Sequence, residues 1–126
     1  MSAVELQKAI FTKLNAVGTY PVYDYVKADT AYPYIIVGDD TLTQDSADDF
    51  IGFDATVTIH SWSVKKGRKE IKTIQDYVFN QLNREILLIS GYNMVNCYQE
   101  YSETFLDPDG VTHHGVQRYR VIFDKS

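Results

Sequence analysis

The stretch FDATVTIHSWS, residues 53–63, decides the fold because its side chains alternate in character along the chain. One set of alternate positions is apolar and the other is polar or aromatic: Phe53, Ala55, Val57 and Ile59 against Thr56, Thr58, His60 and Trp62. A period of two residues is that of a β-strand, whose successive side chains point to opposite faces of the sheet. We therefore predict a strand with one buried face, and the rest of the chain must supply what covers that face.

Two amphipathic helices are predicted, one before and one after this strand. Ser2 and Glu5 have the spacing of a capping box, and a helix over residues 3–17 would end at Gly18. Its apolar positions recur at helical spacing: Leu6, Ile10, Leu14 and Val17. Similar spacing over residues 67–83 gives a second set: Ile71, Ile74, Val78 and Leu82. Each helix has an apolar stripe that a sheet or another helix must cover.

Three further stretches are predicted to be extended. PYIIVGDD, residues 33–40, is an apolar run rich in β-branched residues that ends in a turn signal, as a buried strand does. Residues 91–105 and 115–124 are long strands separated by LDPDG, in which Pro108 presets one backbone angle and Gly110 permits a positive φ. These two strands should form an antiparallel hairpin.

The order of these elements predicts an α+β fold: a largely antiparallel sheet with two amphipathic helices packed on one face. Strands and helices do not alternate strictly, as a parallel α/β sheet would require. A chain of 126 residues fits a single domain, residues 1–126, and contains no repeat or linker. The opposite face of the sheet should carry Thr, Tyr, Arg and Gln side chains and meet solvent or another subunit.

Composition and charge exclude several classes of function. The formal net charge is −5 and the pI is near 5.0, which disfavours a protein that grips phosphate backbones, so we expect no sequence-specific nucleic acid as a partner. No apolar run approaches the roughly 20 residues that span a bilayer, and no secretory signal pattern is present. We therefore expect no membrane partner and synthesis inside the cell. The ten tyrosines suit β-sheets and protein interfaces alike.

No group of residues predicts catalysis, a cofactor or a metal site. His113 and His114 are neighbours on a strand, so they should point to opposite faces and cannot easily share one ion. Cys97 is the only cysteine and lies mid-strand with no helix N-terminus to lower its pKa, so a packed thiol is favoured over a nucleophile. The aspartates of DSADD, residues 45–49, lack the alternating pattern of a calcium loop. We expect a protein that is not an enzyme.

Charge is segregated into two segments. The acidic segment, residues 39–54, has six aspartates and no lysine or arginine, and such dense carboxylates predict a solvated loop. The basic segment, residues 64–72, has five cations and one glutamate. Four of these cations crowd where the second helix begins, and each costs roughly 0.3–1 kcal/mol at low salt beside the positive end of the helix dipole. A broken local rule of this kind is a reasonable place to look for function.

The junction between the strand and the second helix resembles that of a known family. IHSWS, residues 59–63, is followed from Gly67 to Leu82 by G-x-x-x-I-x-x-I and then V-x-x-x-L, and the likeness extends to Val22-Tyr23-Asp24, PYIIVGDD and the final strands. The chain resembles the small tail-completion proteins of long-tailed bacteriophages, the tail-to-head joining or tail terminator group. The resemblance implies a structural virion assembly protein that forms a homo-oligomeric ring, commonly a hexamer, at the head–tail neck.

The resemblance also implies partners and contacts. The ring would cap the finished tail tube, made of the phage tail tube protein, and join it to the head connector protein, with assembly in the host cytoplasm. A closed ring joins two different patches of one molecule, so the two charged segments are candidate contact regions. The candidate contact residues are Lys65, Lys66, Arg68, Lys69, Asp45, Asp48, Asp49 and Trp62. Solvated surface is the alternative for the charged residues, and the edge of the core is the alternative for Trp62.

The residues alone leave a second function open. A small non-enzymatic binding or adaptor module would use the Tyr-rich face of the sheet to hold a peptide or a small ligand. Ring formation in solution would favour the virion protein, whereas a strict monomer at high concentration would favour the module.

Overall fold

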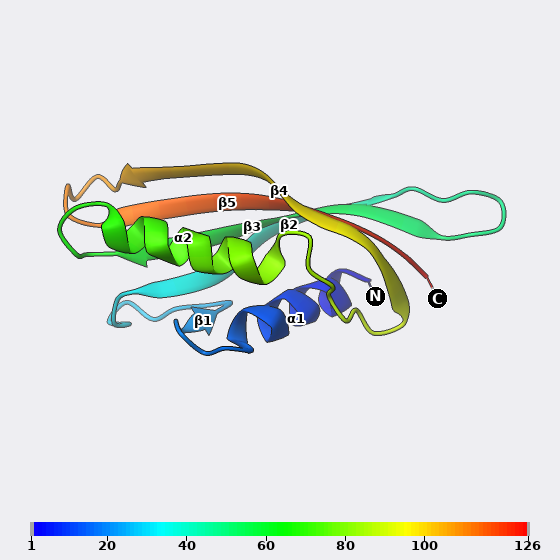
Figure 1. Ribbon diagram of the computed structural model, residues 1–126, viewed down its shortest axis with the longest axis horizontal. Coiled ribbons are helices and arrows are strands. Elements are labelled where there is room, and N and C mark those ends of the chain that lie inside the picture. Colours follow the sequence, from blue (N-terminus) through cyan, green and yellow to red (C-terminus); the bar gives the residue numbers. More distant parts are fainter. Residues whose placement is uncertain (1, 126) are drawn as a thin grey trace.

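The computed structural model describes residues 2–125, which form two helices and five strands (Figure 1). In chain order these are α1 (Ser2–Asn15), β1 (Val22–Tyr23), β2 (Tyr34–Gln44), β3 (Gly52–Ser63), α2 (Lys69–Leu82), β4 (Tyr92–Leu106) and β5 (His113–Lys125). Met1, Ser126 and the side chain of Ser2, with the predicted capping box, lie outside the described residues.

The five strands form one sheet in the order β1-β2-β3-β5-β4, with β3 at its centre. β3 pairs antiparallel with β2 and β5, and β5 pairs antiparallel with β4, whereas the short β1 is parallel to β2. Both helices pack on the same face, α2 against β3, β5 and β4, and α1 against β1 and β2. The predicted α+β fold and the predicted hairpin of the last two strands are confirmed.

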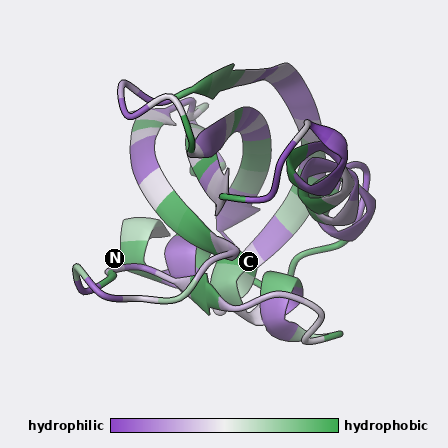
Figure 2. Ribbon diagram, turned by 90° about the vertical axis from the view of Figure 1, so that its left-hand side faces the viewer, coloured by the Kyte–Doolittle hydropathy of each residue, from purple (hydrophilic) through white to green (hydrophobic). Residues whose placement is uncertain are grey.

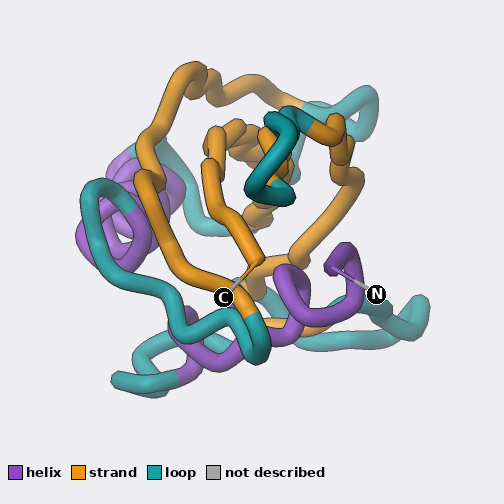
Figure 3. Tube along the Cα trace, turned by 90° about the vertical axis from the view of Figure 1, so that its right-hand side faces the viewer, coloured by secondary structure: helices purple, strands orange, loops and turns teal. Residues whose placement is uncertain are grey.

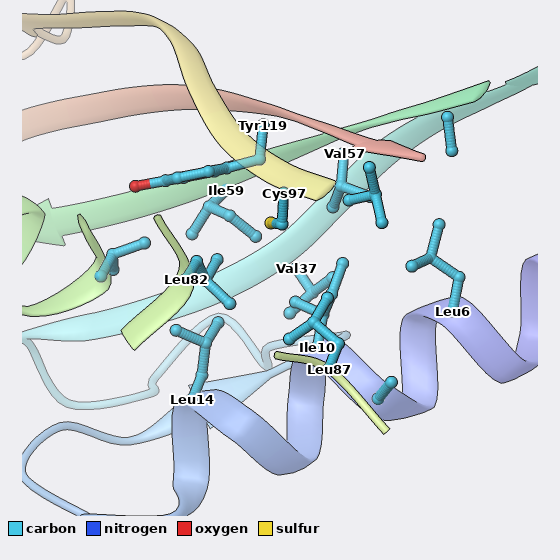
Figure 4. Close-up of a cluster of buried hydrophobic side chains, with 14 of the residues drawn as sticks. Leu6, Ile10, Leu14, Val37, Val57, Ile59, Leu82, Leu87, Cys97 and Tyr119 are labelled. Carbon is cyan, nitrogen blue, oxygen red and sulfur yellow. The ribbon is translucent and has the colours of Figure 1, made fainter. Parts of the chain in front are cut away.

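The buried core lies between the sheet and the helices (Figure 4). From β3 it takes the apolar set that the alternation predicts, with Ala55, Val57 and Ile59 all but inaccessible to solvent. The two helices cover this set with their apolar stripes: Leu6, Ile10, Leu14, Ile74, Val78 and Leu82. Burying a side chain of this size contributes about 1.5–3 kcal/mol, so the packing of helices on sheet is the main source of stability.

Both helices are shorter than their periodicity predicts. α1 ends at Asn15, whose side-chain amide donates to the carbonyl oxygen of Phe11 at 3.0 Å, and Val17 beyond it is exposed. α2 begins at Lys69 rather than at Gly67, because Gly67 has a φ of 80°, which belongs to a turn and not to a helix.

The acidic segment is not a loop, and that prediction is wrong. Residues 39–44 extend β2 and residues 52–54 begin β3, and the two strands pair as a hairpin that projects from one end of the molecule (Figure 1). The carboxylates do not prevent pairing, because β2 runs along the edge of the sheet there and its charged side chains stay in water. Residues 45–51 connect the two strands, and we call them the acidic tip.

Viewed along its long axis, the sheet curls and both helices lie outside the curl (Figure 2, Figure 3). Much of the outward side of α2 is hydrophilic (Figure 2). The opposite side of the sheet, which we call the helix-free face, lines the inside of the curl. Its side chains from β3 are those that alternate with the buried set, and all are half-buried: Thr56, Thr58, His60 and Trp62.

The free edge of β4 is covered by α2 and by the residues that follow it. The backbone N–H of Arg84 donates to the carbonyl oxygen of Cys97 at 2.7 Å. The side-chain oxygen of Asn83 accepts the backbone N–H of Gln99 at 2.9 Å. From within α2, the side-chain amide of Gln75 donates to the carbonyl oxygen of Glu103 at 3.0 Å. An unpaired edge strand is a template for pairing with other chains, and these three bonds occupy part of that template.

Candidate interaction surfaces

The acidic tip is a tight turn with its own hydrogen bonds. Ala47 and Phe50 exchange two backbone hydrogen bonds, at 3.1 and 3.3 Å. The hydroxyl of Ser46 accepts the backbone N–H of Gly52 at 3.2 Å. Asp48 and Asp49 stand at the apex between these bonds and are exposed, so the turn presents two adjacent carboxylates to solvent.

Gly52 permits the tip to close. Asp45 donates its backbone N–H to the carbonyl oxygen of Gly52 at 2.8 Å. A Cβ atom at Gly52 would lie 2.5 Å from the carbonyl oxygen of Asp45 and 2.7 Å from the Phe50 ring, closer than real Cβ contacts. Any side chain here would force the tip open, so the glycine fixes where the carboxylates point.

The basic loop, residues 64–68, connects β3 to α2. Lys65, Lys66, Arg68 and the first helical residue, Lys69, are all exposed. Arg68 occupies the N-cap position of α2 without a side-chain capping bond. Lys65 Nζ lies 4.0 Å from Glu70 Oε2, at the limit of an ion pair, while Glu70 Oε1 accepts a 2.6 Å hydrogen bond from the Ser63 hydroxyl. The loop therefore presents its positive charge to solvent at the N-terminus of a helix.

The acidic tip and the basic loop lie at opposite ends of the longest axis of the molecule (Figure 1). β3 runs from one to the other, because it begins beside the tip at Gly52 and ends beside the loop at Ser63. The candidate contacts Asp45, Asp48 and Asp49 are thus gathered at one end, and the candidate lysines and arginine at the other. The structure brings neither set to the other within one chain, so they can meet only between molecules.

A row of aromatic rings crosses the helix-free face near the basic loop. Phe105 of β4 lies 4.8 Å from His114 of β5, measured between ring centroids, and His114 stacks on Trp62 of β3 at 4.5 Å. Trp62 in turn contacts Tyr34 of β2 at 5.2 Å, and Tyr34 stacks on Tyr32 at 5.2 Å. We call these five residues the aromatic row. Trp62 is half-buried within it, on the face opposite the helices.

His60 and His114 form a pair inside the same face. His60 Nδ1 and His114 Nε2 are 2.9 Å apart, and His114 Nδ1 lies 3.3 Å from Asp107 Oδ1. Burial lowers the pKa of His60, and the neighbouring His114 lowers it further. His113 is buried on the other face, as the alternation of the strand predicts. No local signal in the sequence predicts the pair, because it depends on the register in which β3 and β5 align.

One carboxylate of the acidic segment, that of Asp54, forms an ion pair within the chain. Arg120 on β5 donates to both oxygens of Asp54, at 2.8 and 2.7 Å, and its Nε lies 3.4 Å from Glu100 Oε1. Arg118 lies 3.8 Å from the same glutamate oxygen. These pairs connect β3, β5 and β4 across the helix-free face, so Asp54 belongs to the sheet and not to the exposed acidic tip.

The described residues show no reactive thiol, metal site or membrane-spanning helix. Cys97 is buried, and burial raises its pKa to about 12, so the thiol stays protonated near neutral pH and is a poor nucleophile. Within residues 2–125, no three His, Cys, Asp or Glu side chains are grouped so that they could hold a metal ion. Neither of the two described helices is long and apolar enough to cross a membrane.

Comparisons with known proteins identify the family of the chain. Residues 8–124 match the family described as tail completion protein gp17. The tail completion protein gp17 of Bacillus phage SPP1 is 29% identical over 98 residues, which cover 78% of this chain and 72% of the relative.

Solved structures share the fold. A chain from the virion of a native gene transfer agent particle superposes with a TM-score of 0.86 at 21% identity, covering 98% of this chain and 97% of its own. A second solved chain superposes with a TM-score of 0.64 at 13% identity, covering 100% of this chain and 96% of its own. Since the family match spans nearly the whole chain, the protein is a structural component of the phage virion, located at its tail, and belongs to the tail completion protein gp17 family.

Proposed function

We propose that copies of this protein join head to tail into a closed ring, commonly a hexamer in proteins of this kind, at the junction of head and tail. The ring caps the tube of tail tube protein and presents a surface to the head connector protein. The observation that carries the proposal is the placement of the acidic tip and the basic loop at opposite ends of one chain.

Ring closure requires two different patches that recognise each other. A contact between unlike patches of identical subunits generates a ring when the rotation closes. Opposite charges on the two patches steer the subunits together and disfavour tip-to-tip or loop-to-loop contacts. In addition, a neighbour's carboxylates near Lys65, Lys66 and Arg68 would offset the unfavourable position of these cations at the N-terminus of α2.

The family supports the place of the ring. The name of the SPP1 relative describes a protein that completes a tail, and the structural neighbour comes from a virion. A protein that ends a tail must meet the last layer of the tube on one side and the head on the other. A ring satisfies both demands with one kind of subunit.

Charge exchange tests the ring. Variant one carries Asp48→Lys and Asp49→Lys, variant two carries Lys65→Glu and Lys66→Glu, and variant three carries all four changes. We expect each of the first two to stay monomeric at low salt, and the third to recover the ring, because its charges again attract. Sedimentation velocity and light scattering give the oligomeric state.

A matched control carries the same charge change elsewhere: Asp24→Lys with Asp29→Lys, in the exposed connection between β1 and β2. This control should assemble like the unaltered protein. The ring proposal fails if the unaltered protein is monomeric both alone and with tail tubes, or if electron cryo-microscopy of virions shows no density for this chain at the neck. Unchanged assembly in variants one and two would show that the charged residues are solvated surface and do not form the contact.

A further inference from the structure

The acidic tip carries apolar side chains directly after its carboxylates. Phe50 and Ile51 are 47% and 41% exposed, although each is large and apolar. The backbone of Phe50 is bonded to that of Ala47, so this residue is part of the closed turn. A projecting hairpin with two exposed apolar side chains has the form of an anchor for another surface.

The opposite end of the molecule has a matching apolar surface. Tyr32 and Phe105 are the two ends of the aromatic row, and Val64 is the first residue of the basic loop. These three side chains are between 37% and 43% exposed. Val64 immediately precedes Lys65 and Lys66, so apolar surface and positive charge adjoin here as apolar surface and negative charge adjoin at the tip.

We propose that Phe50 and Ile51 of one copy pack on the aromatic row of the next copy, while Asp48 and Asp49 face its basic loop. The inference rests on the proposed ring and names the apolar contact that holds it. The occupant is a second copy of this chain, because the tip and the row carry opposite charge beside their apolar side chains and lie at opposite ends of the same molecule.

The apolar contact provides most of the stability of the proposed interface, which the exposed charges alone would not. Exposed ion pairs between flexible side chains contribute little to stability and weaken with salt. Interfaces are held mainly by a few aromatic or arginine side chains that fill desolvated positions, surrounded by a polar rim. In this arrangement Phe50 is the central anchor and the paired charges form the rim, which sets the direction of the contact.

Cysteine cross-linking tests the contact directly. Phe50→Cys is combined with Phe105→Cys in one chain, and oxidation should give a ladder of disulfide-linked copies up to a closed ring. The two positions lie at opposite ends of one molecule, so a bond between them must join two copies. Cys97 should not form a disulfide in this experiment, because it is buried and its pKa is raised to about 12.

The matched control combines Phe50→Cys with Leu88→Cys, which is 89% exposed and lies beside α1, away from the aromatic row. No ladder is expected from this pair. A ladder from the control and none from the test pair overturns the inference. It is also overturned if the cysteine introduced at position 50 bonds to added tail tube protein in place of a second copy.

Truncation gives a second measurement that separates this inference from the ring itself. Phe50→Ala should weaken association at least about tenfold, as truncating a central anchor does. Phe79→Ala removes an aromatic ring of similar exposure from α2 and should leave association unchanged. If the unaltered protein forms rings and Phe50→Ala forms them equally well, the anchor is refuted while the ring stands. If the unaltered protein forms no rings with or without tail tubes, the proposed function is refuted.

Discussion

His60 lies half-buried between Trp62 and His114, and this position links the stability of the sheet to pH. Burial and the neighbouring His114 both lower the pKa of His60, whereas Asp39 acts weakly in the opposite direction. The unfolded chain therefore binds a proton at this site more readily than the folded protein does. The stabilising contribution is complete above about pH 6.5, the usual histidine value, and is lost as the pH falls through the lowered pKa of the folded state.

Replacing His60 with glutamine should make stability less sensitive to acid. We expect the free energy of unfolding of the unaltered protein to fall between about pH 7.5 and pH 5, and that of His60→Gln to fall less steeply. Urea titrations at each pH measure the difference. Identical slopes for the two proteins would contradict a contribution of His60 to the pH dependence of stability.

The sequence predicted which face of the sheet a residue lies on. It did not predict which residue of a neighbouring strand it contacts, because that depends on how the strands align. The alternation around His60 and Trp62 assigned both to the face opposite the core, which the structure confirms. The contact of His60 with His114 was not predictable, because these residues lie 54 positions apart and meet only through the alignment of β3 and β5. Two interpretations of Trp62 stay open, the edge of the core and a contact with another subunit, because a half-buried ring on that face is compatible with both.

The β2–β3 hairpin is the element on which the proposed contact between subunits depends most. Its tip closes because Gly52 lacks a side chain, and a Cβ atom there would lie 2.5 Å from the carbonyl oxygen of Asp45. Backbone atoms cannot move aside as the end of a flexible side chain can. Any substitution at Gly52 therefore acts on the shape of the whole tip.

Gly52→Ala should open the tip and destabilise the protein by about 1–3 kcal/mol, the range for overpacking a tight site. Cleavage by a protease specific for aspartate should become faster in the tip than in the unaltered protein. Urea unfolding and mass spectrometry of the fragments measure both effects. Ser46→Ala is the control, since it removes a hydrogen bond at an exposed site and should cost about 0.5–1.5 kcal/mol without opening the turn. Equal cleavage of Gly52→Ala and the unaltered protein would contradict the steric argument.

Elements with strong local signals were predicted well. The turn residues Pro108 and Gly110 predicted the last hairpin, and apolar spacing predicted both helices. The hairpin of the acidic segment was missed because its carboxylates indicated a solvent-exposed loop, and a strand at the edge of a sheet can keep such residues in water while its backbone pairs. Pairing partners, and not side-chain composition, decide whether such a segment is extended.

At the scale of the whole molecule, the decisive feature is polarity along the long axis. The chain is acidic with an exposed Phe50 at one end, and basic with an aromatic row at the other. The two charged segments could be recognised from the sequence, and their role as contacts stays a prediction. Their placement at opposite ends was not predictable, because that depends on β3 running the full distance between them.

Salt should weaken association without abolishing it. The screening length falls from about 10 Å at 0.1 M salt to about 3 Å at 1 M, so charge steering between subunits fades, while the apolar contact persists. We expect the dissociation constant of the ring to rise with salt for the unaltered protein, and Phe50→Ala to dissociate completely in high salt. Analytical ultracentrifugation across a salt series measures both. Association of the unaltered protein that does not depend on salt would contradict a role for the charges.

The hydrogen bonds that cover the edge of β4 also affect how free subunits can associate. Free subunits with an open strand edge can pair with one another through their backbones. Asn83, Arg84 and Gln75 already bond to carbonyl and amide groups along that edge, so less of the β4 backbone is open to a strand of another molecule and fibre growth from this edge is disfavoured.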